Sequence, residues 1–135
     1  MSTETTKNIV RRYIEEVWNK QDIGAVEEFL AENYVDHSLP PEFKGREGVK
    51  QWVKAVSTFF DEQTIIEDQV TEADKTILRL TMRLTHRAEW RGIPATGKQV
   101  EINGYRTYRL EGGKIVEHWA LIDGDSLERQ LRAVN

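Results

Sequence analysis

Up to Asp61, apolar residues recur at intervals of three or four, which is the spacing of amphipathic helices. The pattern predicts three helices. The first presents Ile9, Val10, Tyr13, Ile14, Val17 and Trp18, the second follows a capping Asp22 and presents Val26, Phe29 and Leu30, and the third begins near Gly45 and presents Val49, Trp52, Val53, Val56 and Phe60. A short extended segment, residues 34–37, lies between the second and third helices and ends before Pro40 and Pro41.

After Asp61 the period changes to two, which is typical of half-buried strands. Ile66, Asp68 and Val70 give the weakest of these strands. The run from Lys75 to Arg87 places Leu78, Leu80, Met82, Leu84 and His86 on one face. Two further strands, about Lys98 to Leu110 and Lys114 to Asp123, are joined by a hairpin turn at residues 111–113, and a short helix from Ser126 to Arg132 closes the chain.

Helices followed by hairpin-linked strands indicate an α+β fold in a single domain spanning residues 1–135. A mostly antiparallel sheet of long strands curls, because strands twist. We expect the three N-terminal helices to cover its concave face, so that the sheet and the helices form a cone that encloses a ligand pocket.

The composition is that of an ordinary globular protein, with 39% hydrophobic and 31% charged residues among 135. The net charge is −4 and there is no Lys/Arg cluster, which argues against nucleic acid as a partner. The chain has no cysteine, lacks a signal-peptide pattern at its start, and has no run of about 20 apolar residues that could span a membrane. We therefore expect a cytoplasmic protein.

The last strand ends in a carboxylate, Asp123, which shares its parity with Trp119 and Leu121. If those two face the pocket, so does Asp123, and poor solvation there raises a carboxyl pKa toward the range useful for proton transfer. The alternative is that Asp123 caps the last helix. His118 has the opposite parity, so we expect it on the outer face of the sheet, at a dimer contact.

Two other histidines are candidates for the pocket. His86 ends an apolar strand face, where it either stabilises an enolate oxygen or is a core residue with a satisfied hydrogen bond. His37 lies at the pocket mouth or in a solvated loop. Because the three histidines are far apart and form no short ligand motif, we predict no metal site.

Large aromatic residues are numerous for so small a chain, and flat walls suit a planar or polycyclic ligand. We expect most to be core and several to line the pocket, namely Tyr13, Trp18, Trp52, Trp90, Tyr105 and Trp119, with Asn103 adding a polar group beside Tyr105. Arg79, Arg83 and Arg87 form a row on the other face of their strand. That row is either a solvated surface or a dimer surface with cross-strand ion pairs to Glu101 or Glu117.

Four segments together resemble the SnoaL-like polyketide cyclases, the ester cyclase group of the nuclear-transport-factor-2-like (NTF2-like) superfamily. They are residues 19–22 with 34–37, residues 43–49, His86 with residues 90–94 and 96–98, and residues 113–119 with Asp123, Leu127, Gln130 and Leu131. The resemblance covers nearly the whole chain. Three positions depart from the family pattern, where Ala120 replaces a frequent aspartate, Ala88 a glycine and Ala95 a proline.

The resemblance implies a cone-shaped fold, usually dimeric and without cofactor, that closes a ring by intramolecular aldol chemistry on a small hydrophobic or polycyclic carbonyl substrate. It assigns the acid/base role to Asp123. From the residues themselves we add the hypothesis that His86, with Asn103 or Tyr105, holds the enolate oxygen. Ala120 favours a second hypothesis, a non-catalytic ligand-binding domain. A third is an epoxide hydrolase-like enzyme, which needs two carboxylates bridged by an arginine. Arg106 is the strand arginine nearest Asp123, but its parity differs.

Overall fold

One five-stranded sheet forms the framework of the computed structural model, which describes residues 2–133. Its strands are β1 (Leu30–Asp36), β2 (Phe60–Glu72), β3 (Lys75–His86), β4 (Gln99–Glu111) and β5 (Lys114–Ile122), arranged in the order β1-β5-β4-β3-β2. Neighbours from β2 to β5 pair antiparallel, and β1 pairs parallel with β5. The mostly antiparallel sheet predicted from the sequence is therefore confirmed.

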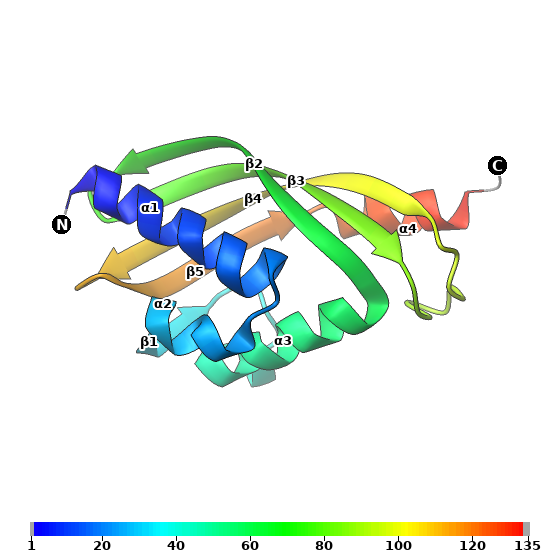
Figure 1. Ribbon diagram of the computed structural model, residues 1–135, viewed down its shortest axis with the longest axis horizontal. Helices are drawn as coiled ribbons and strands as arrows, with labels where there is room; N and C mark the ends of the chain where they lie inside the picture. Colours follow the sequence, from blue (N-terminus) through cyan, green and yellow to red (C-terminus); the bar gives the residue numbers. More distant parts are fainter. Residues whose placement is uncertain (1, 134–135) are drawn as a thin grey trace.

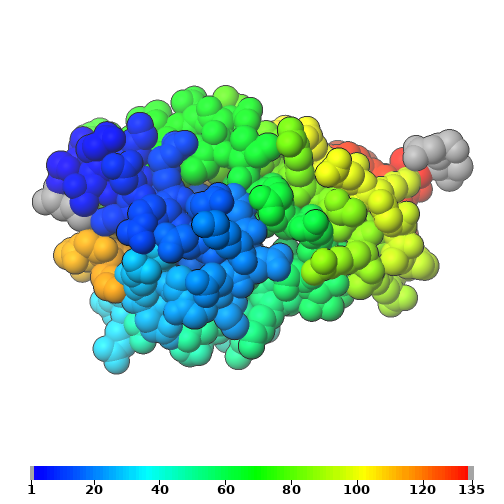
Figure 2. Space-filling model, viewed as in Figure 1, coloured from blue at the N-terminus to red at the C-terminus, as the bar shows by residue number. Residues whose placement is uncertain are grey.

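Helices from the first half of the chain, interrupted by β1, cover one face of the sheet (Figures 1 and 2). They are α1 (Thr3–Tyr13), continued by a π-helix, η1 (Ile14–Asn19), then a short 3-10 turn, η2 (Ile23–Ala25), α2 (Val26–Phe29), a second 3-10 turn, η3 (Pro41–Phe43), and α3 (Arg46–Phe59). A final helix, α4 (Gly124–Arg132), follows β5. The predicted α+β cone with a short C-terminal helix is confirmed. Within residues 2–133, no helix is long and apolar enough to cross a membrane.

The core lies between the helices and the concave face and has two parts. The larger part joins α1, η1, α2 and α3 to the middle of the sheet, around Tyr13, Phe29, Leu78 and Leu80. The smaller part lies at the other end of the sheet, where Phe60, Leu84 and Ile102 meet α4. Strict alternation in β3 produces this division of faces, because Leu78, Leu80, Met82, Leu84 and His86 are all buried.

A bulge in β5 changes which residues face the interior. Leu110 of β4 pairs with Ile115, but the preceding Arg109 pairs with Glu117, so Val116 has no partner. Ile115 and Val116 are consequently both buried, and the alternation after them is reversed. His118 faces inward, and Trp119 and Leu121 face outward. The sequence analysis expected the reverse, with Trp119 and Leu121 facing the pocket and His118 on the outer face, and that expectation was wrong.

The strand β2 is longer than the sequence pattern indicated. It begins at Phe60, and Phe60, Glu62 and Thr64 alternate inward before a register shift between Ile66 and Asp68. The weak pattern around Ile66–Val70 is explained by that shift, because an irregular pairing breaks the period of two. Starting the strand earlier adds a buried carboxyl, Glu62, to the interior.

Candidate functional site

A histidine and an aspartate meet inside the cone, on the parallel pair of strands β1 and β5. Asp36 and His118 are direct partners in the strand register, and both side chains face inward with 5% or less of their residue surface exposed. His118 Nδ1 lies 2.8 Å from Asp36 Oδ2. The β5 bulge at Val116 is what turns His118 toward this contact.

Arg106 of β4 completes a row of three polar residues. Its Nη1 lies 3.2 Å from His118 Nε2, and the guanidinium lies 5.2 Å from the Trp18 ring centre. A guanidinium only donates hydrogen bonds, so His118 Nε2 accepts and Nδ1–H donates to Asp36. Burial, together with the charge of Arg106, lowers the pKa of His118. His118 is therefore a neutral imidazole that connects a carboxylate to a guanidinium.

Asp36 accepts hydrogen bonds from four donors. Its Oδ2 accepts from Tyr34 as well as from His118, and its Oδ1 accepts from both the backbone N–H and the hydroxyl of Ser38. Burial opposes ionisation, but the hydrogen bonds from His118 and Ser38 outweigh it and lower the pKa of Asp36. The carboxylate stays charged and fixes the orientation of the imidazole.

Aromatic rings enclose this row. Tyr108 stacks on His118 with 4.5 Å between ring centres, and Tyr13 packs edge-on against Tyr108 at 5.8 Å. Trp18 Nε1 donates to the Tyr13 hydroxyl over 3.4 Å. Burial raises the pKa of Tyr108 to about 12, so its hydroxyl remains protonated. Tyr13 and Trp18 were expected at a pocket, and both lie beside the buried row.

A second set of interior polar groups lies toward the other end of the sheet. Glu62, 1% exposed, accepts a hydrogen bond from Thr64, and burial raises its pKa. His86 is fully buried; its Nδ1 accepts from the Thr96 backbone N–H at 3.2 Å, and its Nε2 has no partner in the described chain. The prediction that His86 faces the interior is confirmed.

Asp123 does not point into the cone. It is exposed, and its Oδ1 accepts from the backbone N–H of Ser126, so it caps α4. The predicted inward orientation of Asp123 is wrong, because the bulge at Val116 reverses which residues of β5 face the interior before the strand reaches Asp123. Asn103 and Tyr105 share a face as expected, but it is the outer face, where they line a shallow depression of about 530 Å³ together with Asp123.

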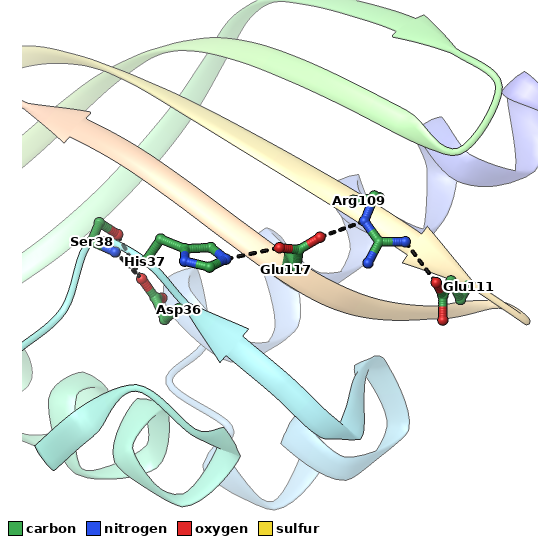
Figure 3. A network of polar contacts seen from close by, with 6 residues as sticks. All are labelled: Asp36, His37, Ser38, Arg109, Glu111 and Glu117. Carbon is green, nitrogen blue, oxygen red and sulfur yellow. Dashed lines mark hydrogen bonds and ion pairs between the residues drawn. The ribbon is translucent and has the colours of Figure 1, made fainter. Parts of the chain in front are cut away.

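His37 and Trp119 also lie outside the cone. Their rings stack with 4.8 Å between centres, and His37 Nε2 lies 2.8 Å from Glu117, which in turn pairs with Arg109 (Figure 3). Hydrogen bonds from Arg109 and His37 lower the pKa of Glu117. These two residues therefore form an outer-surface network rather than a pocket wall.

The two remaining tryptophans are half-buried packing residues. Trp52 packs against Phe43 and the larger core, and Trp90 packs edge-on against Phe60 with 5.3 Å between ring centres. Within residues 2–133, no three histidine or carboxyl side chains converge on a metal position.

Most polar residues of the interior had no predicted role; Arg106 was considered only as a bridge between two carboxylates, and His118 was expected on the outer face. Asp36 and Tyr34 were visible only as parts of a motif, and Glu62 preceded the strand as it was predicted. The available signal for Arg106 and Tyr108 was their position in the strand, because both alternate with less buried residues in β4 and share the inward face with Ile102 and Leu110.

The comparisons with known proteins agree with this architecture. The profile of the family described as SnoaL-like polyketide cyclase matches residues 8–131. No curated protein matches the chain significantly.

Solved structures share the fold over nearly the whole chain. TsrD from Streptomyces laurentii aligns with a TM-score of 0.87 at 23% identity, covering 99% of both chains. A putative polyketide cyclase from Acidithiobacillus ferrooxidans aligns with a TM-score of 0.86 at 27% identity over 98% of both chains. A SnoaL-like polyketide cyclase from Agrobacterium tumefaciens aligns with a TM-score of 0.79 at 24% identity, covering 97% of this chain and 99% of that one. With its NTF2-like fold and a profile match that spans almost its entire length, the chain belongs to the SnoaL-like polyketide cyclase family.

Proposed function

We propose that the protein is a cofactor-independent cyclase that closes a ring by intramolecular aldol chemistry on a small hydrophobic carbonyl substrate. One observation carries the proposal: a neutral imidazole, His118, is held between a buried carboxylate and a buried guanidinium. This is the arrangement of an oriented general base. We assign the role of general base to His118 instead of Asp123, because Asp123 caps α4 outside the cone.

The first step is removal of a proton from a carbon next to a carbonyl group. Arg106 moves from His118 Nε2 to the carbonyl oxygen, which frees the lone pair of Nε2 to accept that proton. The C–H electron pair becomes the enolate, and its negative oxygen is stabilised by Arg106. Asp36 stabilises the imidazolium that forms, through the hydrogen bond from Nδ1–H.

The second step is carbon–carbon bond formation. The enolate carbon attacks a second carbonyl of the same molecule, and the resulting alkoxide takes up a proton. No atom is gained or lost, so the product is an isomer of the substrate. Aromatic rings around the row favour a folded, flat substrate conformation, and such positioning supplies much of the rate enhancement of an intramolecular reaction.

An epoxide hydrolase-like reaction is the second candidate. Two buried carboxyl groups, Asp36 and Glu62, and a buried guanidinium, Arg106, favour it. We rank it second because His118 lies between Asp36 and Arg106, so the arginine does not bridge the two carboxyl groups directly. If the protein catalyses no proton transfer, the remaining alternative is a non-catalytic ligand-binding domain.

Hydrogen–deuterium exchange tests the first step without knowledge of the natural substrate. The probe is a cyclic diketone carrying an oxobutyl side chain, whose methyl ketone protons exchange when the enolate forms. We expect the wild-type protein to accelerate exchange and His118→Gln to lose about 10²–10⁴-fold of that acceleration. His37→Gln is the matched control, because it removes the histidine on the other face of the same strand pair and should retain the full rate.

The pH dependence of exchange provides a check that needs no variant. Because the pKa of His118 is lowered, its base form persists as the pH falls below about 6.5, and the rate should decline only at more acid pH. Absence of exchange in the wild type, an unimpaired His118→Gln, or a decline already centred at or above about pH 6.5 would contradict the proposal.

A further inference from the structure

The interior contains a carboxyl group, Glu62, that the proposed base does not use. It lies on β2, faces inward and is 1% exposed, with Thr64 as its hydrogen-bond partner. Its strand register places it opposite Leu84, in the smaller apolar cluster formed by Phe60, Met82, Leu84, Val100, Ile102 and neighbours. A carboxyl group in such surroundings is poorly solvated unless it carries a proton.

The charges of the interior support the neutral form of Glu62. Among the residues that the structure describes, the buried acidic side chains are Asp36 and Glu62, and the one buried lysine or arginine is Arg106. Asp36 receives four hydrogen bonds and is linked to Arg106 through His118, so these two charges compensate each other. A second carboxylate would leave the interior with an uncompensated charge. Burial accordingly raises the pKa of Glu62 despite the opposing effects of Thr64 and Arg106.

His86 adds an unused donor on the same side of the interior. His86 Nδ1 lies beside both the hydroxyl and the backbone N–H of Thr96, and because a backbone N–H can only donate, Nδ1 accepts and the ring hydrogen is on Nε2. That Nε2 atom is buried without a partner in the described chain. His86 pairs with Phe60 in the strand register, which makes it the diagonal neighbour of Glu62 on the inward face. A buried N–H without an acceptor is costly, and a ligand oxygen would satisfy it.

We infer that Glu62 is the proton donor to the second, electrophilic carbonyl of the substrate, and that the Nε2–H of His86 binds the same oxygen. The inference rests on the proposed function and specifies the substrate class as a molecule with two carbonyl groups, one bound at Arg106 and the other at Glu62. When the enolate carbon attacks the second carbonyl, its C=O π electrons move to oxygen and take the proton of Glu62. The product is a hydroxyl group, and Glu62 becomes a carboxylate.

The two acid–base groups are reset after the product leaves. At that point His118 carries the extra proton taken from the substrate carbon, and Glu62 lacks the one given to the oxygen. Water entering the emptied interior relays the proton from His118 Nε2 to Glu62, so the cycle consumes no proton overall.

The test compares enolate formation in the oxobutyl side chain with ring closure onto a ring carbonyl of the same probe. In Glu62→Gln, we expect deuterium exchange at the wild-type rate and cyclisation reduced by about 10²–10⁴-fold, because an amide donates a hydrogen bond but no proton. Glu67→Gln, which changes an exposed carboxyl of the same strand, should retain both activities. Exchange that persists while Glu62→Gln cyclises at the wild-type rate, or an equal loss of both activities, overturns the role of Glu62. Absence of exchange in the wild type overturns the proposed function instead.

Thermal unfolding tests the protonation state of Glu62 without a substrate. Its folded pKa is raised above the unfolded value, so the folded state binds the proton more tightly and loses stability as the pH rises from about 4.5 through the folded pKa. Glu62→Gln removes this loss. We expect its unfolding midpoint to exceed that of the wild type at about pH 8 and to match it near pH 4. An equal or lower midpoint at the higher pH contradicts a proton-bearing Glu62.

Discussion

Replacing Asp36 by asparagine tests the polar row most directly, because every neighbour of this carboxylate is a donor. Ser38 contributes an N–H and a hydroxyl, Tyr34 a hydroxyl, and His118 the Nδ1–H. An asparagine must turn its NH₂ group toward one side of this set. It then faces either the Ser38 N–H or the imidazole N–H, and His118 cannot exchange its tautomer while Arg106 donates to Nε2.

The expected loss is large. Removing one partner from a buried charge network costs about 3–5 kcal/mol, because Arg106 then remains buried without its compensating carboxylate. For 135 residues the unfolding entropy is on the order of 280 cal/mol/K, so each kcal/mol corresponds to about 3.5 °C in the midpoint. Asp36→Asn should therefore lower the midpoint by about 10–18 °C at neutral pH.

The matched control is the histidine–carboxylate contact on the other face of the same strands. His37→Gln removes the half-exposed contact to Glu117, and surface pairs of this kind contribute little to stability. Thermal unfolding followed by circular dichroism measures both variants. A midpoint for Asp36→Asn within the error of His37→Gln would refute the reasoning.

The same unfolding experiment at acid pH has an expected direction of change. The pKa of Asp36 is lowered in the folded state, so its stabilisation is present above about pH 3.8 and is lost as the pH falls further. The lowered pKa of His118 adds a loss that begins as the pH falls below about 6.5, since the unfolded histidine takes up a proton first. The difference between Asp36→Asn and the wild type should shrink below about pH 3.8, and a constant difference would contradict the assignment.

Two further predictions concern the outer face. Asp123→Ala should lower the free energy of unfolding by about 1 kcal/mol through loss of the α4 cap, whereas Asp123→Asn should leave it almost unchanged. Both variants should retain exchange activity, and lost exchange in the asparagine variant would show that Asp123 is the base. We also expect a homodimer through the outer sheet face, where Ile77, Tyr105, Trp119 and Leu121 are exposed on neighbouring strands, with about 1,600 Å² buried in total. Light scattering should find dimers for the wild type and monomers for Leu121→Glu, and a monomeric wild type would contradict this.

The order of most elements could be predicted from the sequence, because most have a strong local pattern. The helical periods of residues 9–18 and 49–56, the alternation from Lys75 to His86 and the turn after Glu111 correspond to elements of the structure, whereas Leu30 and Phe60, predicted on helices, begin β1 and β2. The sequence could not predict which face of the sheet each residue after the β5 bulge occupies. A bulge inserts one residue into one strand only, and Val116 is an ordinary β-branched residue that gives no sign of it. This single insertion moved His118 into the interior and Asp123 out of it.

Glu62 was missed for a different reason. A charged residue between Phe60 and Thr64 suggests a polar turn after a helix. In the structure, however, α3 ends at Phe59 and β2 begins at the next residue without a loop. Only the pairing of Phe60 with His86 and of Glu62 with Leu84 fixes the start of the strand. Long-range pairing of this kind is not encoded in the local period, so neither the strand start nor its buried carboxyl could be predicted locally.

The geometry of β1 and β5 gives a physical meaning to two of the segments that carry the family resemblance. Residues 34–37 and 113–119 are far apart in the chain but form one parallel strand pair. Asp36 and His37 are adjacent and point to opposite faces, as do Glu117 and His118, so each dipeptide supplies the acid on one face and the base on the other. The inner pair, Asp36 with His118, is buried and orients the proposed base, and the outer pair, Glu117 with His37, is half-exposed. A shift of one residue in this register would break both pairs at once, and in one direction it would place Asp36 opposite Glu117 and His37 opposite His118. The motif therefore specifies the register of the β1–β5 pair as well as the chemistry of the interior.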